Sequence, residues 1–486
     1  MNRELLASIY GCLEHLNFSA LPKLIKQKQV PDGTIPWSKF LVLLQNLGNC
    51  ESMYYKHSYL SLKANNIQDQ YIQVSNDLKN LLKPSSTTTT TTTTTSLNAA
   101  GQPIQSQSQQ SQSLQHRPDD PEYSFISSLV LQTCIIVQVR IDMIGVYTTL
   151  VLSASQRQDV NLDMMINSLE LIPTIYRDKI THPLLLGIKA NTNYEISILR
   201  NLLKVYSFLA RHVFKDTIFM LYQARIELES WKDFDQHNLS RTFDKPTGWQ
   251  SNSIHQWLSL FYSALLAKAT LYFHHPLRTV EEENGGSFAS FKEVVVRNNP
   301  DYCSMIEAFV QKSNACFFGI FLECKGNPYT RTGYSFNSED NIPSGLSAYP
   351  PIYFYPSDKQ PTNYLPNIIS ILLENSSSME RPGDIFFYLD KQIYKADTTH
   401  QSSHHQGQTT PQKGNMSSSS LAALQQEYLS DYTYFLVRID HQLFITVIYR
   451  EIKKQKDSVI NEFLKALVSN LRNTDLFNML RTKRPE

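Results

Sequence analysis

The chain has 486 residues, and its 45 Lys and Arg against 44 Asp and Glu give a net charge of +1. This length has room for two or three domains with sizeable cores. A balanced charge creates no global field of the kind that draws a protein onto nucleic acid, so we expect no nucleic-acid partner. Only 16 residues are glycine, about half the usual frequency of roughly 7%, which favours helices and disfavours phosphate-binding loops.

Apolar spacing predicts a helical N-terminal half made of residues 1–83 and 119–280. Past residue 119 a long helix places Ile126, Val130, Val137 and Ile144 on one face, and its other faces are apolar too. Such a helix is typical of the centre of a bundle. The other predicted helices cover residues 40–62, 67–82, 162–176, 194–213, 218–231 and 257–273, the third of them kinked or ended near Pro173.

Two low-complexity segments interrupt the pattern. Residues 84–118 contain nine consecutive threonines and a Gln/Ser string, and residues 398–420 contain histidines and a run of serines. Neither segment can bury enough apolar surface to offset the entropy lost on ordering. We therefore expect both to be disordered insertions.

The segment 128–152 is apolar enough to be compared with a membrane span. Arg140 and Asp142 lie near its middle, and each such charge costs about 2.5–3.5 kcal/mol at the centre of a bilayer. This cost cancels the gain from the aliphatic residues, so we predict a buried core helix and no transmembrane segment.

The sequence pattern that predicts secondary structure changes after a linker at residues 281–298. Asn299 is predicted to cap a helix with Pro300 at its first position. Short aromatic and β-branched runs then predict strands at residues 316–322, 352–355, 368–373, 385–389, 434–439 and 444–449. The last two of these strands are predicted to form a hairpin. A closing helix covers residues 460–471. The fold class is thus α plus α+β: a multi-helical antiparallel bundle, then an α+β domain over residues 299–486 with a mainly antiparallel sheet and flanking helices.

Cysteine usage and the N-terminus indicate the compartment. The six cysteines form no C-x-x-C pair, four of them lie among apolar residues, and the first residues lack the apolar run of a signal peptide. A reduced, cytoplasmic protein is expected.

The sequence lacks the common motifs for catalysis, nucleotide binding and metal binding. It contains no G-x-G-x-x-G, no P-loop, no G-x-S-x-G and no zinc-binding spacing of Cys and His. His274 and His275 are adjacent, so their side chains diverge on a helix. We expect no catalytic residues, no cofactor and no metal.

Charges inside apolar helices allow two interpretations. Arg140 and Asp142, or Arg225 and Glu227, are either buried deliberately for catalysis or ligand binding, or they form interhelical ion pairs and surface contacts. The second interpretation is favoured, since no motif accompanies them.

Two surface segments are candidates for contact with partners. Prolines and tyrosines predict either a rigid docking loop or a simple tight connection; the loop residues are Tyr355, Pro356, Ser357, Asp358, Leu365, Pro366 and Asn367. A basic cluster made of Arg450, Lys453, Lys454 and Lys456 contacts an acidic lipid or an acidic partner, or is a solvated turn.

Several longer strings resemble the KICSTOR complex subunit 2 family across roughly residues 123–480, outside the second insertion. They are His182-Pro183-Leu184-Leu185, residues 257–274, Asn299-Pro300-Asp301-Tyr302, Pro356-Ser357-Asp358-Lys359, residues 365–369, residues 444–448 and residues 460–471.

The resemblance implies a non-enzymatic scaffold or adaptor subunit. Its partners would be a kaptin-like subunit, an integrin-alpha-repeat protein and a large SZT-like subunit. Through them it would recruit the GATOR GTPase-activating complex to the lysosomal membrane and restrain target-of-rapamycin complex signalling during amino-acid or glucose starvation.

Two other classes of function stay open. One is an enzyme with an unfamiliar site, such as a hydrolase that uses Asp358 and a nearby histidine. The other is a peripheral membrane protein that binds through the basic cluster.

Overall fold

The computed structural model describes residues 3–27, 37–56, 60, 66–82, 121–156, 161–239, 253–283, 300–324, 343–379, 381–390 and 431–480. The chain divides into two compact units. The helical unit comprises residues 1–203, 224–259 and 477–486, and the sheet unit comprises residues 204–223 and 260–476. Both predicted insertions and most of the predicted linker lie outside the described residues.

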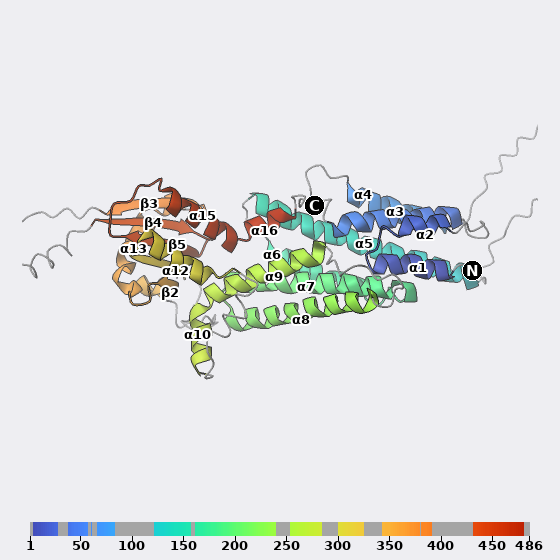
Figure 1. Ribbon diagram of the computed structural model, residues 1–486, viewed down its shortest axis with the longest axis horizontal. Helices are drawn as coiled ribbons and strands as arrows, with labels where there is room; N and C mark the ends of the chain where they lie inside the picture. The colour runs from blue at the N-terminus through green and yellow to red at the C-terminus, as the bar shows by residue number, and fades with distance from the viewer. Residues whose placement is uncertain are drawn as a thin grey trace, which may run out of the picture. The chain divides into compact units, whose positions relative to one another are not determined.

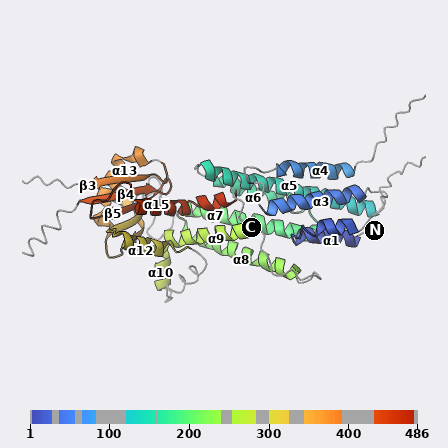
Figure 2. The same cartoon turned by 45° about the horizontal axis from the view of Figure 1, so that its top comes forward.

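The helical unit is built around one long helix, α5 (Pro121–Gln156), which Figures 1 and 2 show alongside α3 and α4. The other helices that contribute to it are α1 (Arg3–Glu14), α2 (Leu21–Gln27), α3 (Trp37–Tyr55), α4 (Ile67–Leu81), α6 (Leu162–Tyr176), α7 (Leu186–Ala210), α8 (Phe214–Leu239) and α9 (Ser253–Tyr272). The helices α7, α8 and α9 also contribute residues to the sheet unit.

The interior position of α5 confirms the predicted core helix. Ile126, Val130 and Val137 are each 0% exposed, and Ile144 is 4% exposed. Among the described helices α5 alone is long and apolar enough to cross a membrane, but 61% of its most apolar window is buried within the protein. Arg140 near its centre is also 0% exposed, which is the burial of a core helix.

The sheet unit contains a five-stranded antiparallel sheet in the order β2-β1-β5-β4-β3. Its further elements are α10 (His274–Glu283), α12 (Tyr302–Ser313), β1 (Phe317–Leu322), β2 (Pro351–Tyr355), α13 (Leu365–Glu374), β3 (Ile385–Asp390), β4 (Tyr432–Arg438), β5 (Leu443–Tyr449), α15 (Ser458–Leu471) and α16 (Thr474–Met479). The predicted hairpin is confirmed: Asp440 Oδ1 accepts from the backbone N–H groups of Gln442 and Leu443, both at 2.9 Å, and so closes the turn between β4 and β5.

Helices cover both faces of this sheet (Figure 2). On one face Phe317, Phe321 and Phe444 pack with Ile368 and Leu372 of α13. On the other face the Tyr449 hydroxyl bonds Ser313 of α12 at 3.2 Å, and α12 stacks on α15 through Phe309 and Phe463, whose ring centroids are 3.8 Å apart. Strands β1 and β5 are buried along their whole length because they lie inside the sheet between these layers.

Two local predictions are wrong. Residues 368–373 form most of helix α13 and not a strand: Pro366 sits in the first turn, and Leu365, Ile368, Ile369 and Leu372 fall on one buried stripe. Asp301, not Asn299, caps α12, and its carboxylate accepts from the Ser304 N–H at 3.2 Å. The helix begins at Tyr302, so Pro300 precedes it.

Candidate functional site: a buried ion cluster and the contact surfaces

A cluster of charged and phenolic side chains lies inside the helical unit. Arg140 of α5 donates from Nε to both oxygens of Glu51 on α3, at 3.1 and 3.2 Å, and from Nη1 to Glu195 on α7 at 3.0 Å. Arg140 and Glu195 are 0% exposed and Glu51 is 5% exposed. One guanidinium therefore joins three helices through two carboxylates.

Tyrosines complete the hydrogen bonds of this ion cluster. The Tyr54 and Tyr147 hydroxyls donate to Glu195 at 2.6 and 3.0 Å, and the Tyr71 hydroxyl donates to Glu51 at 2.8 Å. Arg140 Nη2 donates to the Tyr55 hydroxyl at 2.7 Å, and the Arg140 Cζ lies 4.6 Å from the Tyr54 ring centroid. These contacts extend the cluster to α4 and keep the buried charges hydrogen-bonded.

The electrostatics of the cluster keep its arginine charged. Burial alone would lower the pKa of Arg140, but Glu51, Tyr55 and Glu195 outweigh burial and raise it well above the usual value. Burial also raises the pKa of Glu195, against the opposing effect of Arg140 and the two tyrosine hydroxyls. Since the cluster is closed to solvent, it can fix the register of four helices but cannot receive a substrate.

This geometry confirms the interhelical ion-pair interpretation for Arg140. Asp142 takes no part in the cluster and accepts instead from Gln138 at 3.0 Å and from the Tyr176 hydroxyl at 3.1 Å. Arg225 lies on the surface, where it pairs with Glu229 on its own helix at 2.9 Å. Glu227 accepts from Ser197 and Asn201 of α7, which is a structural contact between helices; the distances are 2.9 and 3.1 Å.

Sequence reasoning missed Glu51 and Glu195. Both occupy positions at which the helical period places a buried residue: Glu51 follows Leu44 and Leu47, and Glu195 precedes Leu199 and Leu202. A carboxylate at such a position signals a buried cation elsewhere in the bundle. That cation is Arg140.

The predicted docking loop is divided between surface and core. Ser357, Asp358, Pro366 and Asn367 are exposed, whereas Leu365 is 7% exposed and belongs to the core packed under α13. Tyr355 and Pro356 are half-buried at the end of β2, and Gln311 Nε2 donates to the Tyr355 hydroxyl at 3.0 Å.

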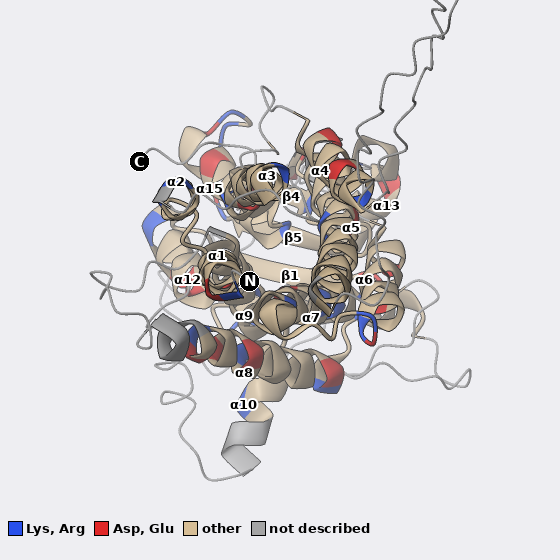
Figure 3. Cartoon of the chain, turned by 90° about the vertical axis from the view of Figure 1, so that its right-hand side faces the viewer, with Lys and Arg blue, Asp and Glu red and all other residues tan. Residues whose placement is uncertain are grey.

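The predicted basic cluster lies on the turn between β5 and α15. Arg450, Lys454 and Lys456 are exposed, but Lys453 is half-buried and pairs with Glu451 at 2.6 Å. Ile452 in the same turn is 62% exposed. Elsewhere the charges are mixed: Figure 3 shows both basic and acidic residues on α8, so this surface helix carries no field of a single sign.

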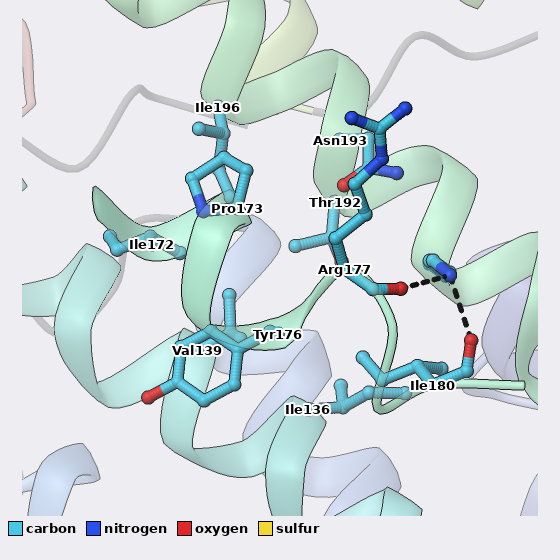
Figure 4. A pocket seen from close by; sticks show the side chains of 11 residues that line it. Ile136, Val139, Ile172, Pro173, Tyr176, Arg177, Ile180, Thr192, Asn193 and Ile196 are labelled. Carbon is cyan, nitrogen blue, oxygen red and sulfur yellow. Dashed lines mark hydrogen bonds between the residues drawn. The ribbon is translucent and has the colours of Figure 1, made fainter. Parts of the chain in front are cut away.

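A small pocket between α5, α6 and α7 has a volume of about 20 Å³ (Figure 4). Ile136, Ile172 and Ile196 contribute to its lining, and Lys189 Nζ beside them donates to the carbonyls of Arg177 and Ile180, both at 2.7 Å. This volume holds about one water molecule. The pocket is thus a packing defect beside a lysine that caps the end of α6.

A larger groove runs along α5 and α6, with a volume of about 430 Å³. Met164, Leu171 and Ile175 of α6 line it and are 53%, 58% and 40% exposed. Gly145, Val146 and Thr149 of α5 form the other wall. The groove therefore presents apolar surface to solvent.

Metal binding has no support in the part of the chain that the structure describes, where no group of three or more His, Cys, Asp or Glu side chains could hold an ion. His274 packs its ring edge-on against Tyr353 at 5.3 Å. Asp358 has no hydrogen bond or ion pair to another described residue.

Comparison with known proteins identifies the family. A family model described as "KICSTOR complex C12orf66 like" matches residues 3–407 and 425–484. Among curated proteins, KICSTOR subunit 2 of Xenopus laevis is 24% identical over 463 residues, which cover 92% of this chain and 88% of that protein. KICSTOR subunit 2 of Danio rerio is 24% identical over 357 residues, which cover 72% of this chain and 70% of that protein. The chain therefore belongs to this family of KICSTOR complex subunits.

Proposed function

We propose that the protein is a non-enzymatic scaffold subunit of a KICSTOR-like complex that recruits the GATOR GTPase-activating complex to the lysosome. In this role it restrains target-of-rapamycin complex signalling when amino acids or glucose are scarce. Its partners are a kaptin-like subunit, an integrin-alpha-repeat protein and a large SZT-like subunit. The protein is cytoplasmic and reaches the lysosomal membrane through these partners.

The observation that carries the proposal is the match of a KICSTOR complex family to nearly the whole chain. The local chemistry supports it. The charged cluster around Arg140 is closed to solvent, whereas the α5–α6 groove exposes Met164, Leu171 and Ile175. Buried charges that hold a bundle together, combined with an open apolar groove, suit a subunit that meets other proteins.

The test is purification of the tagged full-length chain from its own cells, with and without Leu171→Asp. The wild-type chain is expected to recover the other subunits in fixed proportion, and the variant to lose at least one of them because a carboxylate in the groove must be desolvated on docking. Val42→Asp is the matched control, since Val42 is 55% exposed outside the groove. Recovery of the chain alone, together with normal starvation signalling after its deletion, would disprove the scaffold function.

A second candidate is direct membrane contact through the β5–α15 turn. Ile452 is 62% exposed in the turn that also carries the exposed Arg450, Lys454 and Lys456, an arrangement that suits insertion of one apolar side chain into an anionic lipid surface. Lys454→Glu with Lys456→Glu should then abolish flotation with phosphatidylserine vesicles at low salt. Unchanged flotation would exclude this mode of binding.

A further inference from the structure

The two edges of the sheet are protected to different degrees. At the β2 edge the strand begins with Pro351, which has no N–H, and its pairing with β1 is irregular between Ile320 and Phe321. Helix α10 also contacts β2, where His274 packs on Tyr353. Proline, irregular pairing and a covering helix are the features by which proteins block an edge strand.

Among the residues that the structure describes, the β3 edge shows none of these features. Its sequence is Ile-Phe-Phe-Tyr-Leu-Asp, with regular pairing to β4 and every residue half-buried. Its contacts are chiefly with β4 and with the short 3-10 helix η6 (Ser376–Met379) that precedes it. A regular, apolar strand without proline or lysine is a template for another strand.

The hydrogen-bond pattern identifies which backbone groups of β3 are open. The Ile439 N–H donates to the Leu443 carbonyl at 2.8 Å, in register with the pairing of β4 and β5. Because bonded pairs alternate along antiparallel strands, odd-numbered residues of β4 bond to β5 and even-numbered ones bond to β3. The register of β3 with β4 then directs the N–H and C=O groups of Ile385, Phe387 and Leu389 away from the sheet. Among the described residues these outward groups have no partner.

Charge distinguishes between two possible occupants of the β3 edge: β3 of a second copy of this chain, and a strand of a different protein. Pairing β3 with β3 of a second copy about an axis through Phe387 brings all three outward residues together. It also places Asp384 of each copy opposite Asp390 of the other, and like charges directly opposite each other destabilise a strand pair. A strand with basic residues at its ends and apolar residues between them fits both the carboxylates and the apolar faces.

We propose that the β3 edge, through the outward backbone groups of Ile385, Phe387 and Leu389, binds an extended segment of another subunit as a sixth strand. That segment alternates apolar residues and carries Lys or Arg at its ends. The inference rests on the proposed function only in taking its partner from the same complex. Backbone hydrogen bonds supply the affinity, and Asp384 and Asp390 favour the basic ends.

The test is amide hydrogen exchange with single-residue resolution on the full-length chain, alone and in its purified complex. The amides of Ile385, Phe387 and Leu389 should exchange at least about tenfold more slowly in the complex, because each gains a hydrogen bond. The amides of Phe386 and Tyr388 already bond to β4 and serve as internal controls that stay protected in both samples.

Any of the following outcomes would overturn the proposal. Protection of the outward amides in the dilute chain alone would mean that the chain covers its own edge, and protection that rises with concentration would mean self-pairing. An intact complex with unprotected outward amides refutes the edge while leaving the scaffold function in place. Failure to form any complex refutes both.

A charge-reversed pair tests the chemistry of the partner. Asp384→Lys with Asp390→Lys should weaken the complex about three- to tenfold, and more strongly at low salt. Glu374→Lys with Glu462→Lys makes the same change in net charge at exposed positions of α13 and α15. If both pairs of substitutions weaken the complex equally, the proposal that the partner strand has basic ends is wrong.

Discussion

Removal of Arg140 should destabilise the helical unit more than any surface charge can. In Arg140→Met the carboxylates of Glu51 and Glu195 stay buried without their cation, and the Tyr55 hydroxyl loses its donor. Breaking a buried ion pair in this way costs about 3–5 kcal/mol. With a urea slope of about 2–3 kcal/mol per molar, the unfolding midpoint should fall by about 1–2.5 M.

The assay is urea unfolding followed by circular dichroism, with Arg225→Met as the matched control. Arg225 makes an ion pair that is 56% exposed on the arginine side, and such a pair contributes about 0.2–1 kcal/mol. Adding Glu51→Leu and Glu195→Leu to Arg140→Met should recover much of the loss, because no uncompensated charge then remains. If Arg140→Met costs no more than the control, the cluster is not what holds these helices.

The remaining predictions concern Lys268 and two glycines. Burial lowers the pKa of Lys268 to about 8, and Asp440 opposes this effect. Below pH 8 the buried ammonium therefore lowers the free energy of unfolding by its full desolvation cost. The protein regains this stability as the pH rises from 8 towards 10.5. Lys268→Met should therefore stabilise the protein at pH 7 by about 1–2 kcal/mol, after allowing for lost cation–π contacts, and remove this pH dependence of the melting temperature. Gly319→Ala should cost about 1–3 kcal/mol, because its Cβ would lie 2.6 Å from a Phe321 ring atom. Gly11→Ala, with nothing within 4 Å of the new Cβ, should instead stabilise α1 by about 0.5–1 kcal/mol in thermal unfolding.

Periodicity predicted those elements whose burial is one-sided or complete over a long stretch. It identified α5 as the core helix, and the two apolar runs that flank the polar residues 440–442 identified the β4–β5 hairpin. It failed at residues 368–373, where six largely apolar residues fit a buried strand and a buried helix equally well. The deciding features were Pro366 in the first turn and the spacing of Leu365 and Leu372, which lie seven residues apart on one face.

The ion cluster could be predicted only in part, for a different reason. Arg140 is conspicuous in an apolar helix, but its partners Glu51 and Glu195 lie 89 and 55 residues away in the sequence. No local pattern encodes such a pairing, because it depends on how separate helices pack. The edge of β3 is similar: its apolar sequence predicts a strand, and only the order of the sheet places it at the rim.

The division of the chain into units has a consequence for its folding. The backbone crosses between the helical and sheet units four times, at residues 203/204, 223/224, 259/260 and 476/477. Within the helical unit Phe477 packs against Trp257, with ring centroids 6.4 Å apart, so this unit includes an aromatic contact between residues that are far apart in the sequence. Neither unit can be excised with a single cut, because each is made of more than one segment of the chain. Folding of the helical unit therefore depends on contacts between segments that lie more than 200 residues apart in the sequence.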